Sequence, residues 1–394
     1  MAGPLHGVRV LDFGRYIAGP YCAALLAEFG ADVIRIDKRG GSEDRFVGPV
    51  SSTGEGALYL QMNRNKRSLT LDPTSPEGRE IVRRLVERAD VVVANLPPAT
   101  LVSMGLDYGS LSAINPRIIL TTSSAYGPSG PMADYVGFDG VGQAMSGAVY
   151  MTGKPGEPYR AAVNWVDFGT ALHCAFGTMG ALMARQQTGR GQQVTGSLLG
   201  TALATTNSML IEQATIRADR KPTGNLGQTA APVNIYPTRD GFVLVQVVGQ
   251  PLFHRWAKLV GQEAMLDDPR FADDDARGRN AGPIDEAMRE WCAQRDTDEA
   301  VRILGEARIP SGPVLSAQQA LDHPQVAALG LLQPTEFPGL RRPAPVAAAP
   351  VRLSESDTGI RSRAPVLGEH TDEILASVGY SAADIARLRA AGAI

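Results

Sequence analysis

The sequence is poor in the features that mark secreted, membrane and metal-dependent proteins. Its three cysteines are an odd number without metal-type spacing, and we expect them to be reduced core residues. Its five histidines are scattered, and neither H-E-x-x-H nor a paired C-x-x-C occurs, so we expect no metal site. No apolar run is long enough to cross a bilayer, and the opening residues lack the pattern of a signal peptide. We therefore expect a cytoplasmic protein that binds no membrane.

An excess of positive charge is lacking as well. The formal net charge is -3 at pH 7, which provides no field for attracting nucleic acid. Hydrophobic residues make up 44% and charged residues 20% of the 394 residues, a composition typical of a soluble globular protein. A chain of this length can bury a large core, and its length suggests two domains.

Several catalytic motifs are also missing. There is no G-x-x-x-x-G-K-[ST] loop, and the serine of residues 196–200 is misplaced for a G-x-S-x-G elbow, so ATP-driven ligation and serine hydrolysis are unsupported. Residues 8–37 have a strand–helix–strand pattern with Asp37 at the place of a ribose-binding acid. The loop 14–20, however, lacks G-x-G-x-x-G. A nicotinamide-dependent enzyme is thus a weak alternative.

Hydrophobic patterning is what the sequence does offer. Short apolar strands alternate with amphipathic helices over the first part of the chain. The predicted strands are residues 8–13, 32–37, 68–72, 90–95 and 116–123, and the predicted helices include residues 21–29 and one that begins after the capping residue Ser75. This alternation predicts an α/β fold with a Rossmann-like, mainly parallel sheet and helices on both faces.

Polar, turn-rich residues divide the chain into regions. We predict that residues 1–220 form the first part of a large domain and that residues 225–330 form a smaller α+β domain. Within the smaller domain, an Asp-Gly pair at Asp240 predicts a β-hairpin, and Trp256 and Trp291 are predicted to anchor the core.

Asp167 directly precedes residues 168–185, in which apolar side chains recur at helical spacing. Its expected place is the N-cap of this helix, a role worth about 1 kcal/mol. Gly169, Gly177 and Gly180 lower helix propensity, which suggests that another backbone approaches closely and that the helix is buried. A stabilising cap would explain Asp167 by itself, so a catalytic role needs support from the surrounding sequence.

Motifs around Asp167 supply that support. The Gly- and Pro-rich segment 126–131 and the pair 138–139 precede it, the turn 188–194 follows it, and the basic run 63–68 lies earlier in the chain. Together these segments resemble the class III CoA-transferases, the family of formyl-CoA transferase, carnitine CoA-transferase and the α-methylacyl-CoA racemases. The resemblance implies that Asp167 is the catalytic nucleophile.

The resemblance spans nearly the whole chain and implies its organisation. Residues 331–394 would be a connector followed by a C-terminal return to the large domain. Two long connectors would let two chains interlock as a homodimer. The implied partners are small molecules, an acyl-CoA and a carboxylic acid.

The resemblance also implies a binding site for coenzyme A, which acts as a substrate. The implied contact residues are Ile17, Lys38, Arg39, Arg64, Lys66, Arg67, Leu71, Asn95, Leu96, Met104, Tyr126 and Asp139. Lys38 and Arg39 also follow a predicted parallel strand, at the edge where open α/β sheets bind their ligands. The cations of the run 63–68 could balance the phosphates of such a ligand.

A thioester is already activated, so moving CoA between two carboxylates needs no ATP. We expect Asp167 to form a mixed anhydride with the donor acyl group and then an aspartyl-CoA thioester. Backbone N–H groups near Gly137, Gly140 and Gly142 are candidates for stabilising the oxyanions. One alternative is an acyl-CoA racemase or epimerase on the same scaffold, although Phe138 replaces the histidine that transfers a proton in racemases. A non-catalytic CoA-binding protein is the other.

Three departures from the family pattern bear on the substrate. Ile17 stands where oxalate-type members often have glutamine, Ser103 where some members have arginine, and Val136 where some have lysine. We therefore expect oxalate and formate to be poor substrates. A larger or more apolar acyl group is expected, of which a dicarboxylic acid mono-thioester is one example.

Overall fold

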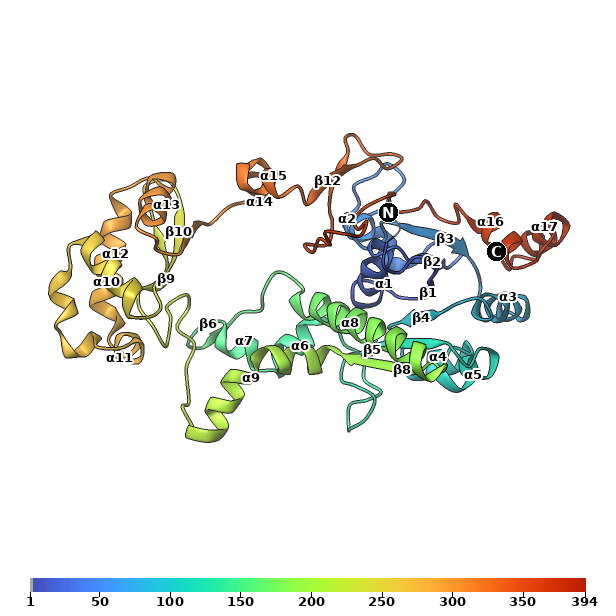
Figure 1. The fold of residues 1–394 in the computed structure, drawn as a ribbon, viewed down its shortest axis with the longest axis horizontal. Coiled ribbons are helices and arrows are strands. Elements are labelled where there is room, and N and C mark those ends of the chain that lie inside the picture. The colour runs from blue at the N-terminus through green and yellow to red at the C-terminus, as the bar shows by residue number, and fades with distance from the viewer. Residues whose placement is uncertain (1–2) are drawn as a thin grey trace. The chain divides into compact units, whose positions relative to one another are not determined.

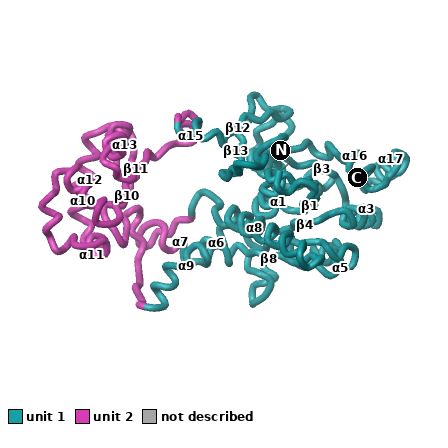
Figure 2. Tube along the Cα trace, in the orientation of Figure 1, with its two compact units in different colours: residues 1–148, 161–215, 325–394 teal, residues 149–160, 216–324 magenta. Residues whose placement is uncertain are grey.

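The computed structural model describes residues 3–394, which belong to two compact units (Figure 2). Unit 1 comprises residues 1–148, 161–215 and 325–394. Unit 2 comprises residues 149–160 and 216–324. Unit 1 is therefore built from three separate stretches of the chain, one of them C-terminal.

A six-stranded parallel sheet is the centre of unit 1 (Figure 1). Its strands are β1 (Arg9–Asp12), β2 (Asp32–Asp37), β3 (Lys66–Thr70), β4 (Val91–Ala94), β5 (Ile119–Ser124) and β8 (Gln193–Ser197). They lie in the order β3-β2-β1-β4-β5-β8, and every neighbouring pair is parallel. The predicted Rossmann-like parallel sheet is confirmed.

Helices cover both faces of this sheet. They are α1 (Ala18–Glu28), α2 (Ala57–Met62), α3 (Pro76–Val86), α4 (Pro98–Ser103), α5 (Tyr108–Ile114), α6 (Asp139–Met145), α8 (Trp165–Thr188), α16 (Thr371–Ser377) and α17 (Ala382–Ala390). Successive strand residues point to opposite faces. Val10 and Val33 accordingly pack with α1 and α8, whereas Leu11 and Ile34 pack with α3, α5, α16 and α17.

The strand order reverses between β1 and β4, and the loops that follow these two strands meet at that point. The Arg15 N–H donates to Asn95 Oδ1 at 2.7 Å, and Asn95 Nδ2 donates to the Arg15 carbonyl at 2.8 Å. In open α/β sheets the crevice outside the carboxyl ends of the strands, at such a reversal, is where ligands bind. The fold therefore predicts a ligand site at the carboxyl edge of the sheet, between β1 and β4.

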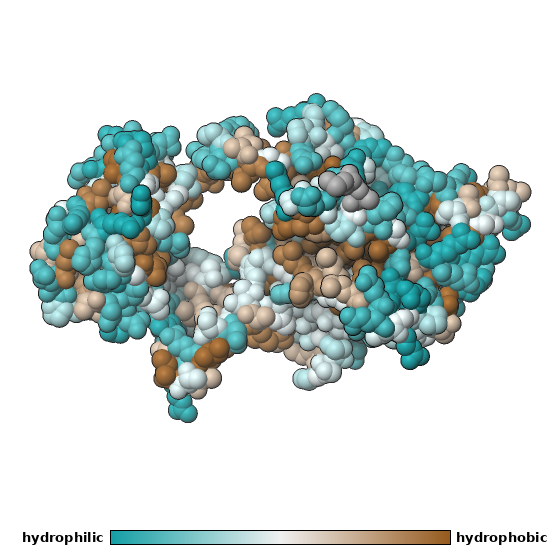
Figure 3. Space-filling view, viewed as in Figure 1, coloured by the Kyte–Doolittle hydropathy of each residue, from teal (hydrophilic) through white to brown (hydrophobic). Residues whose placement is uncertain are grey.

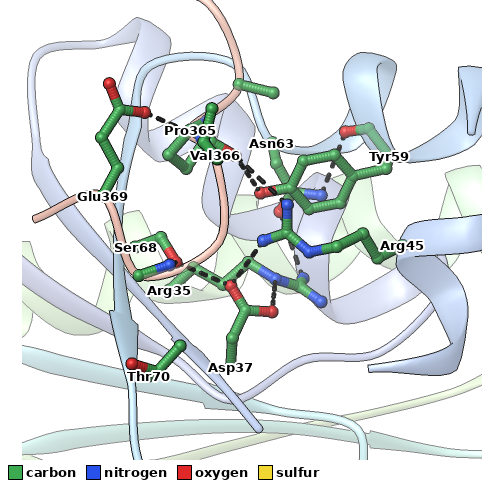
Figure 4. Close-up of polar contacts among 12 residues, drawn as sticks. Arg35, Asp37, Arg45, Tyr59, Asn63, Ser68, Thr70, Pro365, Val366 and Glu369 are labelled. Carbon is green, nitrogen blue, oxygen red and sulfur yellow. Dashed lines mark hydrogen bonds and ion pairs between the residues drawn. The ribbon is translucent and has the colours of Figure 1, made fainter. Parts of the chain in front are cut away.

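The C-terminal stretch of unit 1 is attached beside β3. Arg45 and Tyr59 both donate to the carbonyl of Pro365, at 3.3 and 2.8 Å (Figure 4). The His370 N–H donates to the Ser68 carbonyl at 3.0 Å. These bonds hold the segment that leads into α16 and α17.

Shorter elements complete unit 1. They are the 3-10 helix Glu43–Phe46 and the antiparallel strands β12 (Leu332–Thr335) and β13 (Ala344–Ala347). Helices α7 (Ala148–Met151), α9 (Leu198–Ile216) and α15 (Pro324–Leu329) cross the unit boundaries.

Unit 2 contains a three-stranded antiparallel sheet and several helices. Its strands β9 (Val233–Pro237), β10 (Phe242–Gln246) and β11 (Ser311–Pro313) lie in the order β11-β10-β9. Its other elements are β6 (Gly153–Lys154), β7 (Glu157–Pro158), α10 (Gln250–Val260), α11 (Asp274–Arg279), α12 (Ala281–Ala293), α13 (Thr297–Glu306), α14 (Ala317–Asp322) and the 3-10 helices Glu263–Leu266 and Pro269–Phe271. The β9–β10 pairing confirms the hairpin predicted at Asp240, and Trp256 and Trp291 are core residues as predicted.

The long helix α8 has one buried face and one exposed face. Ala171 and Ala175 are buried with α1, whereas Leu172, Phe176 and Met183 are 52%, 81% and 68% exposed. Hydrophobic surface is visible in the part of unit 1 where Figure 1 draws α8 (Figure 3). The expectation that this helix is buried is therefore wrong for one of its faces, because its apolar residues are too many to fit on the side that meets the sheet.

Two of the three glycines of α8 mark close contacts. A Cβ at Gly169 would lie 2.9 Å from Thr201, and one at Gly177 would lie 2.8 Å from Val194, but in both cases the neighbour is a side chain and not a backbone. A Cβ at Gly180 would meet no atom within 4 Å.

None of the helices in residues 3–394 has both the length and the apolar sequence that a membrane span requires.

Candidate active site

Asp167 lies in the first turn of α8, one turn inside the position predicted for it. The helix begins at Trp165 and its N-cap is Asn164, so the N-cap prediction is wrong. The reason is that another carboxylate meets the helix start: Asp139 Oδ1 accepts the N–H of Val166 at 2.8 Å and that of Asp167 at 3.0 Å. The Asp167 side chain is therefore not needed as a cap.

Asp139 is the first residue of α6 and is only 4% exposed. Its second oxygen accepts a hydrogen bond from Gln143 Nε2. Gln143 Oε1 in turn accepts the N–H of Ala161 at 2.9 Å. One buried carboxylate thus joins α6 to the first turn of α8 and to the segment before it.

The Asp167 carboxylate has few polar contacts of its own. The residue is 8% exposed, and among residues 3–394 no donor makes a hydrogen bond to its side-chain oxygens. Burial, together with the nearby charge of Asp139, raises the pKa of Asp167 to about 7. A carboxylate that is poorly solvated and more basic than usual is suited to attack an electrophile.

Asp167 lines a cavity of about 270 Å³, which we call the inner cavity. Its wall is largely apolar and includes Tyr16, Tyr135, Val136 and Phe138. The rings of Tyr16 and Phe138 meet edge to face with centroids 5.4 Å apart. Tyr16 has φ +61, an uncommon left-handed conformation that aims its ring at this wall.

A second cavity of about 640 Å³, the outer cavity, adjoins the inner one. Both are lined by Arg15, Leu96 and Pro97. Six of the predicted CoA contacts line the two cavities, namely Lys38, Arg39, Leu71, Asn95, Leu96 and Met104. The structure therefore brings half of the predicted residues together at the carboxyl edge of the sheet, next to the predicted nucleophile.

The cations of the run 63–68 lie elsewhere. Arg64 pairs with Glu28, Lys66 Nζ lies 2.7 Å from Asp12 Oδ2, and Arg67 Nη2 lies 2.7 Å from Asp32 Oδ2. Burial lowers the pKa of Lys66 to about 8, while Asp12 opposes that shift. In the described residues 3–394 none of the three lines either cavity. Their part in binding CoA stays a prediction, and the contacts observed are structural ion pairs.

Three further predicted contacts also stand outside the two cavities as the structure describes them. Ile17 is 4% exposed and is the N-cap of α1. Tyr126 is half-buried and packs against the cluster that includes Ala18, Val166 and Leu198. Asp139 caps α8, as described above. Their roles toward CoA stay predictions as well.

Asp37 does not serve as the ribose-binding acid that its position suggested. Its carboxylate accepts hydrogen bonds from Arg35 Nε at 2.9 Å, Arg45 Nη2 at 2.8 Å and Ser68 Oγ at 2.9 Å (Figure 4). Although burial raises the pKa of Asp37, the two arginines outweigh that effect and keep it below its usual value. Asp37 lines the outer cavity, and these three bonds hold it as part of the wall.

Arg15 is the site residue that sequence reasoning missed. The glycine spacing of the loop 14–20 gives no indication that the cation within it lies at the site. The signal was its position directly after the first strand of the sheet, where a side chain points toward the ligand edge.

The glycines proposed for oxyanion binding differ in their surroundings. Gly137 lines the inner cavity. A Cβ at Gly142 would lie 2.9 Å from the Val166 side chain and 3.2 Å from the Leu198 carbonyl, so this glycine allows α6 to approach α8. Gly140 has open space around it.

Among residues 3–394, no three His, Cys, Asp or Glu side chains gather as metal ligands would.

Known proteins are similar to this chain over nearly its whole length. A family model described as CoA-transferase family III matches residues 5–371. Succinyl-CoA--D-citramalate CoA-transferase of Chloroflexus aurantiacus is 35% identical over 391 residues, covering 98% of this chain and 97% of the relative. Succinate--glutarate CoA-transferase of Agrobacterium fabrum is 33% identical over 394 residues, covering 95% and 96%.

A solved structure gives the same answer for the fold. A CAIB/BAIF family protein from Brucella suis has a TM-score of 0.84 and 32% identity, covering 96% of this chain and 100% of that one. The chain therefore belongs to CoA-transferase family III and is an enzyme of that class.

Proposed function

We propose that the enzyme moves CoA from an acyl-CoA thioester to a carboxylic acid, with Asp167 as the nucleophile. The observation that carries this proposal is the state of the Asp167 carboxylate. It lines the inner cavity, and Asp139 makes the hydrogen bonds at the helix start that an ordinary capping aspartate would make. The side-chain oxygens of Asp167 are therefore available to attack a substrate.

In the first half of the reaction, an Asp167 oxygen attacks the thioester carbonyl carbon of the donor. The C–S bond then breaks, leaving CoA thiolate and a mixed anhydride between Asp167 and the donor acyl group. The thiolate attacks the Asp167 carbonyl carbon, and the anhydride C–O bond breaks. The donor acid leaves as its carboxylate, and Asp167 carries CoA as a thioester.

The second half repeats these steps with the acceptor acid. Its carboxylate attacks the Asp167 thioester to form a new anhydride and thiolate. The thiolate then attacks the acceptor acyl carbon, which gives the product acyl-CoA and restores the Asp167 carboxylate. The cycle exchanges one thioester for another with no net proton transfer, so it is close to energy-neutral and needs no ATP.

The residues that line the two cavities suit an acyl-CoA. The outer cavity offers the cations Lys38 and Arg39 for phosphate groups, and the apolar side chains of Leu71 and Met104 for an adenine ring. The smaller inner cavity, with its apolar wall, suits the pantetheine arm and the acyl group, with Asp167 at hand for the thioester.

We propose dicarboxylic acids of four or five carbons as the substrate class. Both relatives named above act on such acids, as their names state. The replacements at Ile17, Ser103 and Val136 disfavour oxalate and formate. The aromatic wall of Tyr16 and Phe138 supports a substrate with a carbon chain to bury.

Racemisation is disfavoured by the same wall. Phe138, which stands where racemases carry a proton-transferring histidine, lines the inner cavity. A phenyl ring can neither donate nor accept the α-proton. We therefore propose transfer and not epimerisation for this site.

We also propose that the enzyme is a homodimer. The exposed face of α8, formed by Leu172, Phe176 and Met183, is a stripe of large apolar side chains on one helix. Such a stripe is unfavourable in water and is typical of a surface that another chain covers.

The proposed mechanism is tested by trapping CoA on the enzyme. The enzyme is incubated with succinyl-CoA, digested, and the peptide that contains Asp167 is weighed by mass spectrometry. The proposal expects a CoA adduct on this peptide that hydroxylamine removes and that Asp167→Asn abolishes, together with a loss of transfer activity of at least about 1000-fold.

A matched variant, Asp267→Asn, changes an exposed aspartate outside both cavities and should keep the adduct and the activity. Full transfer activity in Asp167→Asn, or exchange of the α-hydrogen with deuterated water and no adduct, would rule out the mechanism.

A further inference from the structure

Four buried cations of unit 1 are paired with carboxylates of the chain itself. Each of the following has such a partner: Arg35, Arg45, Arg64 and Lys66. A buried charge is costly unless it is paired, so these pairs explain why the four cations can lie inside the unit. They are also unavailable for a ligand.

Arg15 is different, because no carboxylate of residues 3–394 pairs with it. Its Nη1 donates only to main-chain carbonyls, those of Gly14 at 2.8 Å, Phe13 at 3.2 Å and Ile36 at 3.4 Å. Its Nε and Nη2 meet no acceptor among the described residues. Two donor groups of a planar, permanently charged side chain are thus left for a ligand.

The position of Arg15 is well defined. Asn95 holds its backbone with two hydrogen bonds, at 2.7 and 2.8 Å. Burial and the neighbouring Arg35 lower the pKa of Arg15, and the carboxylates of Asp44, Asp37 and Asp12 oppose this shift without making a hydrogen bond to Arg15. Those three carboxylates are already paired with Arg35, Arg45 and Lys66. A guanidinium that has no ion-pair partner among residues 3–394 and two donor groups without an acceptor is suited to bind an anion.

We propose that Arg15 binds the diphosphate of coenzyme A and so sets how far the thioester reaches toward Asp167. This inference rests on the proposed function. Arg15 lines both the outer and the inner cavity, together with Leu96 and Pro97, and so lies where the two cavities adjoin.

The order of the chemical groups in CoA matches the order of the charged residues from the outer cavity to the inner cavity. In CoA the 3′-phosphoadenosine comes first, then the diphosphate, then the pantetheine arm and the sulfur. In the protein the exposed cations Lys38 and Arg39 line only the outer cavity, Arg15 lines both, and Asp167 lines only the inner one. The diphosphate is the anion that falls in the middle of the ligand, as Arg15 falls in the middle of the site.

The second carboxylate of a dicarboxylic acyl group is the competing anion. The hydrogen bonds of Arg15 do not favour this carboxylate as its ligand. Nη1 reaches the carbonyl of Ile36 at the end of β2, and Ile36 lines the outer cavity but not the inner one. The charged end of the side chain thus lies toward the nucleotide side, away from the acyl group.

The test compares Arg15→Met and Arg15→Lys with ligands that lack one anion at a time. Dissociation constants are measured by calorimetry for CoA and for dephospho-CoA, which lacks only the 3′-phosphate. The kcat/KM is measured with succinyl-CoA, butyryl-CoA and S-succinyl-pantetheine, which has no phosphate. Because hydrogen bonds to charged groups are the strong ones, we expect Arg15→Met to weaken CoA and dephospho-CoA equally, by about 10- to 100-fold.

The same variant should lower kcat/KM for succinyl-CoA and butyryl-CoA alike and leave turnover of S-succinyl-pantetheine unchanged, which also shows that the variant folds. Arg15→Lys should recover part of the affinity. The matched control Arg190→Met removes an exposed arginine outside both cavities and should bind like the native enzyme.

Three results would overturn the assignment. A penalty that disappears with dephospho-CoA would place Arg15 on the 3′-phosphate. A penalty that persists with S-succinyl-pantetheine and disappears with butyryl-CoA would place it on the acyl carboxylate. Unchanged binding of all ligands would make Arg15 structural only. If the native enzyme itself failed to bind CoA, the proposed function would fail, which these variants do not decide.

Discussion

The Asp167 side chain is buried and ionisable, and burial disfavours its charged form. Its carboxylate is buried beside Asp139, which disfavours the charged form and raises its pKa to about 7. No donor among residues 3–394 compensates for this. A residue selected for stability alone would be paired, so the arrangement favours a reactive carboxylate at the expense of stability.

The pH dependence of activity should report this carboxylate. Only ionised Asp167 can attack the thioester, so kcat/KM should fall about tenfold per pH unit below about pH 7 and level off above it. Initial rates with succinyl-CoA and a fixed acceptor acid measure this. A profile that stays flat down to pH 5 would show that the attacking group has an ordinary pKa.

Stability should depend on the same group in the opposite sense. The folded protein keeps a proton on Asp167 up to about pH 7, whereas the pKa of an aspartate in an unfolded chain is 3.8. The free energy of unfolding should therefore fall as the pH rises from about 4 to 7, and the ionised side chain should remain unfavourable above that.

Asp167→Asn removes this cost. We expect the variant to be more stable than the native enzyme by roughly 1–3 kcal/mol at pH 8, with the difference shrinking toward pH 4. Urea unfolding at both pH values measures it. A variant that is less stable at pH 8 would mean that the carboxylate has a stabilising partner after all.

At the scale of elements, the active site depends on how α6 meets α8. Asp139 at the start of α6 accepts two N–H groups of α8, and Gly142 lets the two helices approach. The contact places the first turn of α8, and with it Asp167, at the inner cavity. The packing of α6 against the first turn of α8 therefore positions the proposed nucleophile.

Two glycine variants on α6 separate packing from helix propensity. Gly142→Ala places a methyl group 2.9 Å from Val166, so we expect a loss of about 1–3 kcal/mol in the free energy of unfolding. Gly140→Ala has open space and should be neutral or gain up to about 1 kcal/mol. Urea unfolding of both variants decides; equal effects would contradict the close contact.

Much of the fold of both units was predictable because its signals are local. Strand alternation, the Ser75 cap, whose side chain accepts from the Gly78 N–H, and the β9–β10 hairpin all depend on neighbouring residues. The cap of α8 was not predictable in this way, because Asp139 lies 28 residues before Asp167 and only the fold brings them together. The pairing of Lys66 with Asp12, 54 residues away, escaped prediction for the same reason.

At the scale of the whole molecule, the exposed apolar stripe on α8 has to be accounted for. Phe176 is 81% exposed, although the opposite face of the same helix is packed in the core. A large exposed ring of this kind is unfavourable in water. The proposed homodimer would give this face a partner.

Phe176→Glu should therefore weaken the dimer. We expect light scattering after size exclusion to give twice the chain mass for the native enzyme, and a concentration-dependent shift toward the single chain for the variant. Phe242→Glu, which changes an exposed phenylalanine of unit 2, serves as the matched control. A native enzyme that runs as a single chain at micromolar concentration would contradict the homodimer.

The central claim is that Asp167 exchanges an oxygen with its substrates, and isotope labelling tests it most directly. The acceptor acid is supplied with ¹⁸O in its carboxylate, the enzyme turns over many times, and the peptide containing Asp167 is weighed. Because the bridging oxygen of the second anhydride stays with the enzyme, we predict that this peptide gains ¹⁸O and that the released donor acid also becomes labelled. Label in the released acid with an unlabelled Asp167 peptide would mean that the two acids react directly, and that Asp167 does not carry the acyl group.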